Sequence, residues 1–195
     1  MNKPLINILT RATRPKYFKV LKESIESQTY QNINWIVGCD NGLIEGIKLT
    51  LGELEYPIPQ PSTYPAPWNK HCETLAEYCK EGWIMYCDCD DKFTSSNSIE
   101  EIMNQIDNEN QLLIWRVEIN PDFIVPRQQD FGKIIAAGNI SGVGIAFHTK
   151  HLPVKWSTWS IADFRVVVQL LKKGLEPKFI NKILTKCQEG AHNGK

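Results

Sequence analysis

The chain has 195 residues, of which 42% are hydrophobic, and this size is typical of one globular domain. Its 22 Lys and Arg residues are balanced by 22 Asp and Glu residues, so the formal net charge is zero. Nucleic-acid-binding proteins usually carry a basic excess or a basic stripe, and this sequence has neither. Nucleic acid is therefore not an expected partner.

The sequence predicts neither a membrane span nor a secretion signal. No apolar run approaches the ~18–20 residues that a membrane helix needs, and the residues after Met1 lack a signal-peptide pattern. We therefore expect a cytoplasmic protein, in the host cytoplasm if it is viral. The 6 cysteines form no C-x2-C pair, which favours free, buried thiols over a structural zinc site.

In chain order, the first apolar, β-branched run predicts a strand at residues 5–10. A helix at 16–27 would bury Phe18, Leu21 and Ile25 on one face. A strand at 34–39 and a short helix at 43–51 are expected next. The prolines between residues 57 and 67 then predict an extended loop, because proline lacks an N–H and has a fixed φ.

The second part of the chain continues the alternation. We expect a helix at 68–80, a strand at 83–87, a helix that begins at Ser95 or Ser96 and ends at 106, and a strand at 112–118. Residues 121–150 are expected to be irregular and β-rich. A helix at 162–173 and a strand at 179–184 would follow, and the helix would bury Phe164, Val167, Val168 and Leu171.

Strands that alternate with helices predict an α/β fold, here a single domain whose mostly parallel central sheet is flanked by helices. In such sheets the ligand crevice lies beyond the carboxyl ends of the strands. The residues that follow the strands are therefore the candidates for binding. Arg11 and Arg14 follow the first strand and can meet phosphates, while Asp40 ends the second and can accept a hydrogen bond from a base or ribose.

The acidic run after the third strand is the sharpest feature of the sequence. Asp88, Asp90 and Asp91 fall within four residues, and their charges repel one another unless a cation is present. Carboxylate oxygens suit Mn²⁺ or Mg²⁺, with substrate phosphates completing the ligand shell. The alternative is a solvated acidic turn that caps the next helix. The position directly after a buried strand favours the metal site.

Three further segments are candidates for the site. Asp163 begins a predicted helix, where an Asp usually complements the helix dipole, but Trp156 and Trp159 before it could raise its pKa and hold a sugar ring. At the C-terminus, His192 could ligate a metal and Lys195 could meet a phosphate, with a disordered polar terminus as the alternative. The glycine-rich residues 139–144 would let backbone approach a ligand or form a bulge.

Together these segments resemble the GT-A-fold glycosyltransferases, especially the large inverting family 2. The matching stretches are NILTRATRP at 7–15, SIESQTY at 24–30, WIVGCDN at 35–41 and DCDD at 88–91. The resemblance is clearest over residues 5–41 and 83–91. It implies a Rossmann-like GT-A fold, with a nucleotide-sugar-binding half at about 1–115 and an acceptor-side half with the C-terminal tail at about 116–195.

The resemblance also implies roles for residues on the donor side. Asp40 would hydrogen-bond the base, which in this fold is often uracil, and Thr10 and Arg11 would line the nucleoside pocket. Arg14 and Lys70 are further candidates for donor binding.

The metal and diphosphate roles fall on the acidic run and the tail. Asp88 would contact the ribose or a metal-bound water, and Asp90 would bind the metal. His192 matches a C-terminal metal-binding histidine, and Lys195 belongs to a shortened form of a diphosphate motif found in some retaining members, which leaves the stereochemistry open.

The implied activity is sugar transfer from a UDP-sugar, UDP-glucose-like or UDP-rhamnose-like, to a hydroxyl of a carbohydrate acceptor on a glycan or glycoprotein. Asp163 stands where inverting members have their general base, although Ala162 replaces the Glu before it. Nucleotidyl transfer and non-catalytic nucleotide-sugar binding are the alternatives. The short chain resembles one domain of a longer viral or bacterial glycan-building enzyme, and chlorella-virus glycosyltransferases are among the proteins that it resembles.

Overall fold

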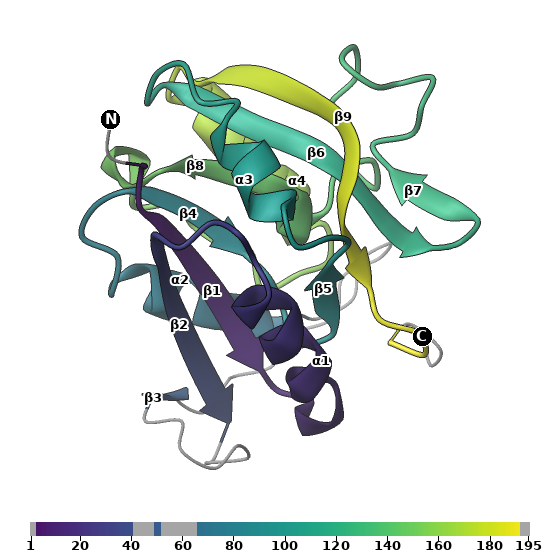
Figure 1. Ribbon diagram of the computed structural model, residues 1–195. Helices are drawn as coiled ribbons and strands as arrows, with labels where there is room; N and C mark the ends of the chain where they lie inside the picture. Colours follow the sequence, from purple (N-terminus) through teal and green to yellow (C-terminus); the bar gives the residue numbers. More distant parts are fainter. Residues whose placement is uncertain (1–2, 41–48, 52–65, 192–195) are drawn as a thin grey trace.

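The computed structural model describes residues 3–40, 49–51 and 66–191. Its centre is one 9-stranded sheet with the order β3-β2-β1-β4-β8-β6-β9-β5, and β7 pairs with β6 outside this path (Figure 1). The strands are β1 (Ile6–Ala12), β2 (Ile33–Asp40), β3 (Leu49–Leu51), β4 (Trp83–Tyr86), β5 (Asp91–Phe93), β6 (Gln111–Asn120), β7 (Phe123–Val125), β8 (Ile145–His148) and β9 (Glu176–Cys187).

Most of the long strands run in one direction. β1 pairs in parallel with β2 and β4, and β2 pairs in parallel with β3. β8 lies antiparallel between β4 and β6, so β6 and its parallel neighbour β9 again run in the direction of β1. The predicted α/β fold with a mainly parallel sheet is confirmed.

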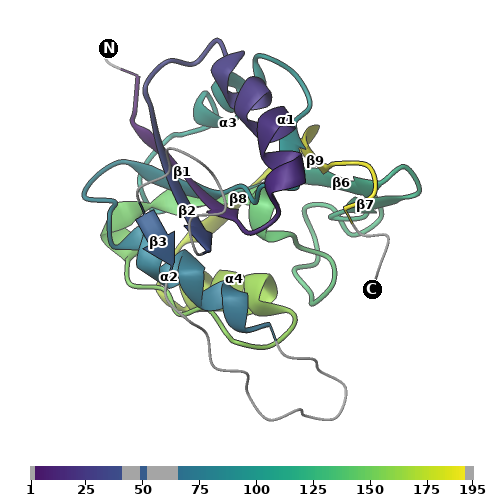
Figure 2. The ribbon, with the colours of Figure 1, turned by 90° about the horizontal axis from the view of Figure 1, so that it is seen from below.

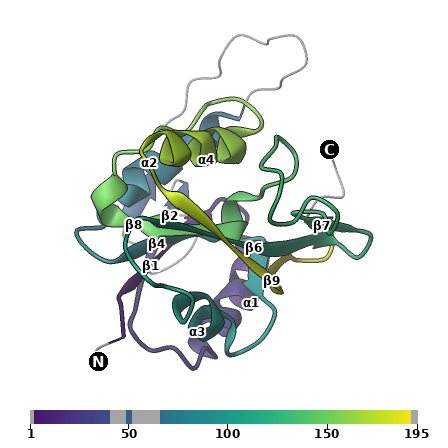
Figure 3. The same cartoon turned by 90° about the horizontal axis from the view of Figure 1, so that it is seen from above.

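Helices cover both faces of the sheet (Figures 2 and 3). On one face lie α1 (Pro15–Glu26) and α3 (Ser98–Met103), and on the other lie α2 (Lys70–Ala76) and α4 (Ala162–Lys172). Among the described residues, no helix is long and apolar enough to cross a membrane.

Each face of the sheet has its own apolar core, because side chains alternate along a strand. In β4, Met85 belongs to the core that includes Leu21 of α1, while its neighbour Ile84 belongs to the core that includes Leu75 of α2. Both cores are closed to solvent, which explains why the central strands read as continuous apolar runs.

The buried faces of the two longest helices differ from the predicted ones by about one position. In α1, Leu21 and Ile25 are buried as predicted, but Tyr17 is buried in place of Phe18, whose ring stacks on Trp35 at 5.5 Å. In α4 the prediction is correct for Val167, and Leu171 is partly buried and packs against the core. It is wrong for Phe164 and Val168, which are partly buried and are not among the described residues packed against that core. The buried residues there are Ala162, Val166, Val167 and Leu170.

Several short elements differ from expectation. Residues 49–51 form strand β3 rather than the end of a helix, and the rest of the predicted helix at 43–51 lies outside the described residues. Strand β5 was not predicted; it pairs with β9, far away in sequence. A 3-10 turn over Pro67–Asn69 precedes α2, and α3 begins after Asn97 rather than after Ser95 or Ser96.

The strand order places a crevice at the ends of β1 and β4. The chain passes from β1 through α1 to β2 on one side, and then returns through α2 to β4 on the other side of β1. Because the chain leaves β1 to one side through α1 and returns to its other side through α2, the carboxyl ends of β1 and β4 form the switch point where such sheets bind ligands.

Gly82 is the tightest point on the approach to β4. Its φ is +83°, and a Cβ there would lie 2.6 Å from the Leu5 carbonyl oxygen, which also accepts a hydrogen bond from Trp83 N at 2.8 Å. Neither the backbone conformation nor the space accommodates a side chain.

We expect Gly82→Ala to lower the free energy of unfolding by about 2–4 kcal/mol, because it combines an unfavourable φ with a backbone clash. Gly174→Ala is the matched control, since Gly174 has φ +85° and a Cβ there would meet nothing within 4 Å. That variant should lose only about 1–2 kcal/mol. Urea titration of both variants measures the difference, and equal losses would contradict the clash at Leu5.

Candidate functional site

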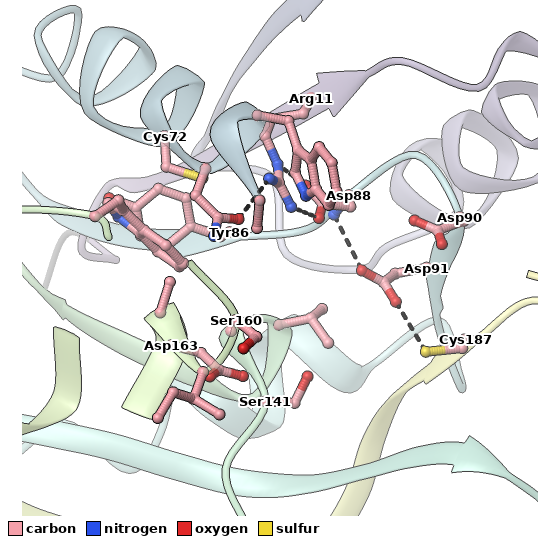
Figure 4. A pocket seen from close by; sticks show the side chains of 18 of the residues that line it. Arg11, Cys72, Tyr86, Asp88, Asp90, Asp91, Ser141, Ser160, Asp163 and Cys187 are labelled. Atoms are coloured by element: carbon pink, nitrogen blue, oxygen red, sulfur yellow. Dashed lines mark hydrogen bonds and ion pairs between the residues drawn. The ribbon is translucent and has the colours of Figure 1, made fainter. Parts of the chain in front are cut away.

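A pocket of about 260 Å³ opens at the ends of β1 and β4 (Figure 4). One wall carries Arg11, Arg14 and the acidic turn that follows β4. The opposite wall is formed by the glycine-rich segment around Gly142 and by the start of α4 with Asp163. The pocket is thus lined from both halves of the chain at the predicted edge of the sheet.

The acidic turn brings Asp88, Asp90 and Asp91 together. Each offers a carboxylate oxygen within 4.8 Å of the others, and Asp90 and Asp91 are only 4% and 7% exposed. Asp91 accepts hydrogen bonds from Asp88 N at 3.1 Å and from the Cys187 thiol at 3.3 Å (Figure 4). Burial, followed by the charges of Asp90 and Asp88, raises the pKa of Asp91 well above its ordinary value.

Two arginines face these carboxylates. Arg11 forms a two-pronged ion pair with Asp88, from Nε at 2.7 Å and from Nη2, and its Nη1 donates to Asn69 Oδ1 at 3.1 Å. Burial disfavours the charged guanidinium of Arg11, but the neighbouring groups, Asp88 foremost, together outweigh it and raise the pKa of Arg11. Arg14 pairs with Asp90 and also donates to the Ala191 carbonyl oxygen at 2.9 Å.

The acidic turn fits the predicted cation. Three carboxylates supply hard oxygen atoms of the kind that Mg²⁺ and Mn²⁺ prefer, and they do not form a closed cage, so phosphate oxygens could complete the shell. The raised pKa of Asp91 shows how strongly burial and mutual repulsion disfavour the full negative charge. Positive charge at this place relieves that repulsion.

Asp163 faces the acidic turn from the other wall, in the first turn of α4. Its Oδ1 accepts a hydrogen bond from Phe164 N at 2.8 Å. Burial raises the pKa of Asp163, while hydrogen bonds from the backbone, including Gly142, and the charge of Arg11 act in the opposite direction. A carboxylate with a raised pKa in a pocket is suited to accept a proton.

Gly142 allows this wall to approach closely. A Cβ on Gly142 would lie 3.3 Å from Trp156 Cη2 and 3.7 Å from the Cβ of Asp163. The expectation that the glycine-rich segment lets backbone approach a ligand fits this position, because Ser141, Gly142 and Val143 line the pocket.

The floor of the pocket is buried and uncharged. The rings of Tyr86 and Trp156 meet edge to face with centroids 4.8 Å apart. Burial raises the pKa of the Tyr86 hydroxyl, and it raises the pKa of the Cys72 thiol to about 12, so both groups stay neutral at physiological pH. Because these groups are buried and neutral, the local dielectric is low, and this strengthens the charge interactions of Arg11 beside them.

The structure brings five of the ten predicted site residues into this pocket. Arg11, Arg14, Asp88, Asp90 and Asp163 all line it. Asp91, which the sequence placed in the acidic run, joins them as a third carboxylate.

Other predicted residues lie elsewhere. Thr10 is fully buried and ties the strands together: its hydroxyl donates to the Cys87 carbonyl oxygen at 2.8 Å and accepts from Trp35 Nε1 at 2.9 Å. Lys70 is exposed on α2 and pairs with Glu73 at 2.8 Å. Neither is among the described residues that line the pocket.

The remaining predicted residues fall outside the part of the chain that the structure describes. His192 and Lys195 belong to residues 192–195, which are not described. Asp40 ends β2, where its backbone pairs with Leu51, but its side chain is not described. Their roles stay predictions.

Asn69 and Cys187 are pocket residues that the sequence did not indicate. Asn69 follows the proline-rich stretch, and only its polar character at the start of a helix could have marked it. Cys187 reaches the site because β9 pairs with β5 next to the acidic turn, a long-range contact without a local signal. The expected free thiols are confirmed, with five of them buried and Cys187 partly exposed.

No family model and no curated protein matches the sequence, but solved structures match the fold. TarS of S. aureus superimposes with a TM-score of 0.72 at 12% identity, over 94% of this chain and 36% of that chain. TarS 1-349 in complex with UDP-GlcNAc gives 0.70 at 14% identity, over 96% and 60%. The mannosyltransferase PcManGT of Pyrobaculum calidifontis, in complex with GDP-Man and Mn²⁺, gives 0.62 at 13% identity, over 100% and 59%.

The chain has the Rossmann-like fold of glycosyltransferases. It spans 36% to 60% of the length of these solved proteins. The predicted glycosyltransferase fold is confirmed, whereas membership of family 2 and a viral origin stay predictions.

Ile161 stands at the edge of the pocket in an unusual conformation. It is the residue before α4, with φ 61° and ψ 24°, and among the described non-glycine residues it alone has a positive φ. Left-handed backbone is rare for a β-branched side chain, and 40% exposure of Ile161 means that packing offsets little of the strain.

We expect Ile161→Asn to raise the free energy of unfolding by about 0.5–1 kcal/mol, because asparagine tolerates left-handed backbone. Ile134→Asn is the control: Ile134 is 48% exposed and has no positive φ, so its replacement should change stability by less than about 0.5 kcal/mol. Thermal unfolding of both variants measures this. A loss of stability in Ile161→Asn would show that the conformation is not strained.

Proposed function

We propose that this chain is a glycosyltransferase domain that takes a sugar from a UDP-sugar, with Mn²⁺ or Mg²⁺, and passes it to a carbohydrate hydroxyl. One observation carries the proposal: within a glycosyltransferase fold, a single pocket holds two arginines and three carboxylates on one wall and Asp163 on the other. The neighbours solved with UDP-GlcNAc and with GDP-Man and Mn²⁺ support a nucleotide-sugar donor.

The donor wall would bind the nucleotide diphosphate. Asp88, Asp90 and Asp91 would hold the divalent ion, and Arg11 and Arg14 would donate hydrogen bonds to phosphate oxygens. The ion, when bound, would act as a Lewis acid and neutralise the charge of the leaving diphosphate.

The residues outside the described part extend this proposal. Asp40 at the end of β2 would accept a hydrogen bond from uracil N3–H, a donor that adenine and cytosine lack on the corresponding ring nitrogen. His192 and Lys195 would reach the same diphosphate from the tail, and the hydrogen bond from Arg14 to Ala191 supports this, because it holds the preceding residue beside the acidic turn.

Asp163 would complete an inverting transfer. It would take the proton from the acceptor hydroxyl while the sugar leaves the diphosphate on the opposite wall, so the new bond forms on the face away from the leaving group. The donor half at about 1–115 would thus supply the leaving-group side, and the half at about 116–195 the acceptor side.

Calorimetry with nucleotides tests the donor site. With Mn²⁺ present, UDP should bind more tightly than ADP or CDP, and Asp90→Ala should lower UDP affinity at least ~10-fold, because removing one buried metal ligand or charge partner costs more than 1.4 kcal/mol. Asp122→Ala removes an exposed acidic residue outside the pocket and should leave UDP affinity unchanged. Equal binding of UDP and ADP would refute the proposed base, and an unaffected Asp90→Ala variant would refute the metal site.

Release of nucleoside diphosphate separates transfer from the two alternatives. UDP-GlcNAc, UDP-glucose, UDP-rhamnose and GDP-mannose would be incubated with the protein and Mn²⁺. Release of the nucleoside diphosphate supports glycosyl transfer, pyrophosphate exchange would support nucleotidyl transfer, and binding without turnover would support a non-catalytic module.

Asp163→Asn should lower this turnover by ~10²-fold or more and leave UDP affinity unchanged, since the amide keeps the shape but cannot accept the proton.

Because burial raises the pKa of Asp163, the wild-type rate should fall as pH decreases, with a midpoint above the ordinary ~3.9 of an aspartate. The folded protein binds that proton more tightly than the unfolded chain does. The stability contribution of Asp163 is therefore present at low pH and lost as pH rises through the raised pKa, so Asp163→Asn should not destabilise the protein at neutral pH. A wild-type rate in Asp163→Asn, or a product that keeps the anomeric configuration of the donor, would exclude this role.

A further inference from the structure

We infer that Asn69 is a positioning residue that couples binding of the nucleotide diphosphate at Arg11 to ordering of the segment 157–159, which leads to Asp163. The inference rests on the proposed function, because it assumes a diphosphate beside Arg11. It assigns to Asn69 a link between the donor wall and the acceptor wall of the same pocket.

Asn69 is only 8% exposed, and all its side-chain polar atoms point to the two walls. Its Oδ1 accepts from Arg11 Nη1 at 3.1 Å, while its Nδ2 donates to the carbonyl oxygen of Ser157 at 3.0 Å and of Trp159 at 3.4 Å. The orientation of the amide is unambiguous, since a guanidinium only donates and a carbonyl only accepts.

Because the guanidinium of Arg11 is planar, its hydrogen bond to Asn69 is sensitive to a diphosphate bound beside Arg11. Arg11 uses Nε and Nη2 for Asp88 and Nη1 for Asn69, so its three contacts share one rigid plane. A diphosphate that draws Arg11 toward its oxygens tilts or shifts this plane. The position of Nη1, and with it the orientation of Asn69, must respond.

Segment 157–159 is held by residues at and before the start of α2 and by Arg165 of α4, which hydrogen-bonds the Ser157 hydroxyl. Ala66 N donates to the Thr158 carbonyl oxygen at 2.7 Å, and Glu73 accepts from Trp156 N at 2.7 Å. Asn69 lies between these two contacts and adds the connection to β1. Ser160 and Ile161 follow the segment and line the pocket before Asp163, so its order bears directly on the acceptor wall.

Such coupling is reciprocal: if the diphosphate stabilises segment 157–159, then ordering of that segment raises affinity for the diphosphate by the same factor, typically ~5-fold or more. In the proposed reaction, a bound donor would therefore favour an ordered acceptor wall, and an ordered acceptor wall would favour the bound donor.

Hydrogen–deuterium exchange with UDP and Mn²⁺ as the probe tests the coupling without a known acceptor. In the wild-type chain, saturating UDP should slow amide exchange in residues 155–163 at least ~5-fold. In Asn69→Leu, which removes all three hydrogen bonds, saturating UDP should no longer slow exchange there. Asn69→Asp keeps the acceptor for Arg11 but cannot donate to the two carbonyls, so it should also lose the protection while it still binds UDP.

Asn7→Leu is the matched control. Asn7 is a buried asparagine whose amide donates to two backbone carbonyl oxygens, of Glu81 at 2.8 Å and of Trp83 at 2.9 Å, at the opposite end of β1. Its loss should destabilise the fold but keep the UDP-induced protection of 155–163. Protection that persists in UDP-saturated Asn69→Leu or Asn69→Asp, or that is missing in the UDP-bound wild type, would overturn the coupling. Failure of the wild type to bind UDP would instead contradict the proposed function on which it rests.

Discussion

The site depends on one electrostatic constraint, the clustering of three carboxylates, two of them buried, in the turn after β4. Without positive charge beside them, the mutual repulsion of carboxylates so close together at a buried position would drive the turn apart. Arg11 and Arg14 each neutralise one of them, and the end of the chain returns to hold the backbone in place. The amide nitrogen of Gln188 lies 3.0 Å from the carbonyl oxygens of Tyr17, Cys89 and Asp91, and its backbone N donates to Asp90 O at 2.7 Å.

This constraint explains why the fold includes the short strand β5 and the long strand β9 beside the acidic turn. β5 is only three residues long, yet it fixes the acidic turn because it pairs with β9, and the same pairing carries Cys187 to Asp91. The late strand thus extends to Cys187, beyond the apolar run that marks a strand in the sequence. A charged turn that had no such support would relax toward solvent, and its oxygen atoms would no longer converge.

The sheet and the donor wall were predictable from the sequence because their signals are local. Apolar runs mark β1, β2 and β4, and the polar residues directly after them must meet at one edge of a parallel sheet. The rest depends on contacts between distant segments. The sequence around Asn69 gives no sign that its side chain hydrogen-bonds Ser157. The sequence around Thr10 gives no sign that its hydroxyl is already hydrogen-bonded to Cys87 and Trp35 and is therefore not available to a ligand. The buried face of α4 was misjudged because helical periodicity alone does not determine which of two adjacent stripes meets the sheet.

The two walls of the pocket are held by different kinds of interaction, and this difference bears on the proposed transfer. The donor wall is held by the ion pairs Arg11–Asp88 and Arg14–Asp90. A diphosphate would compete with the carboxylates for the arginines, and a cation would compete with the arginines for the carboxylate oxygens, so both ligands can rearrange these pairs. The acceptor wall is held by packing of α4, by the hydrogen bond from Trp156 N to the Glu73 carboxylate of α2 and by the hydrogen bond from Ala66 N to the Thr158 carbonyl oxygen. Its exposed edge keeps Ile161 in a left-handed conformation that local preferences oppose. Strain that persists at the edge of a pocket, next to a carboxylate with a raised pKa, supports the proposed role of this wall. The Arg11–Asn69 hydrogen bond is a direct contact by which the rearrangeable wall can act on the fixed one.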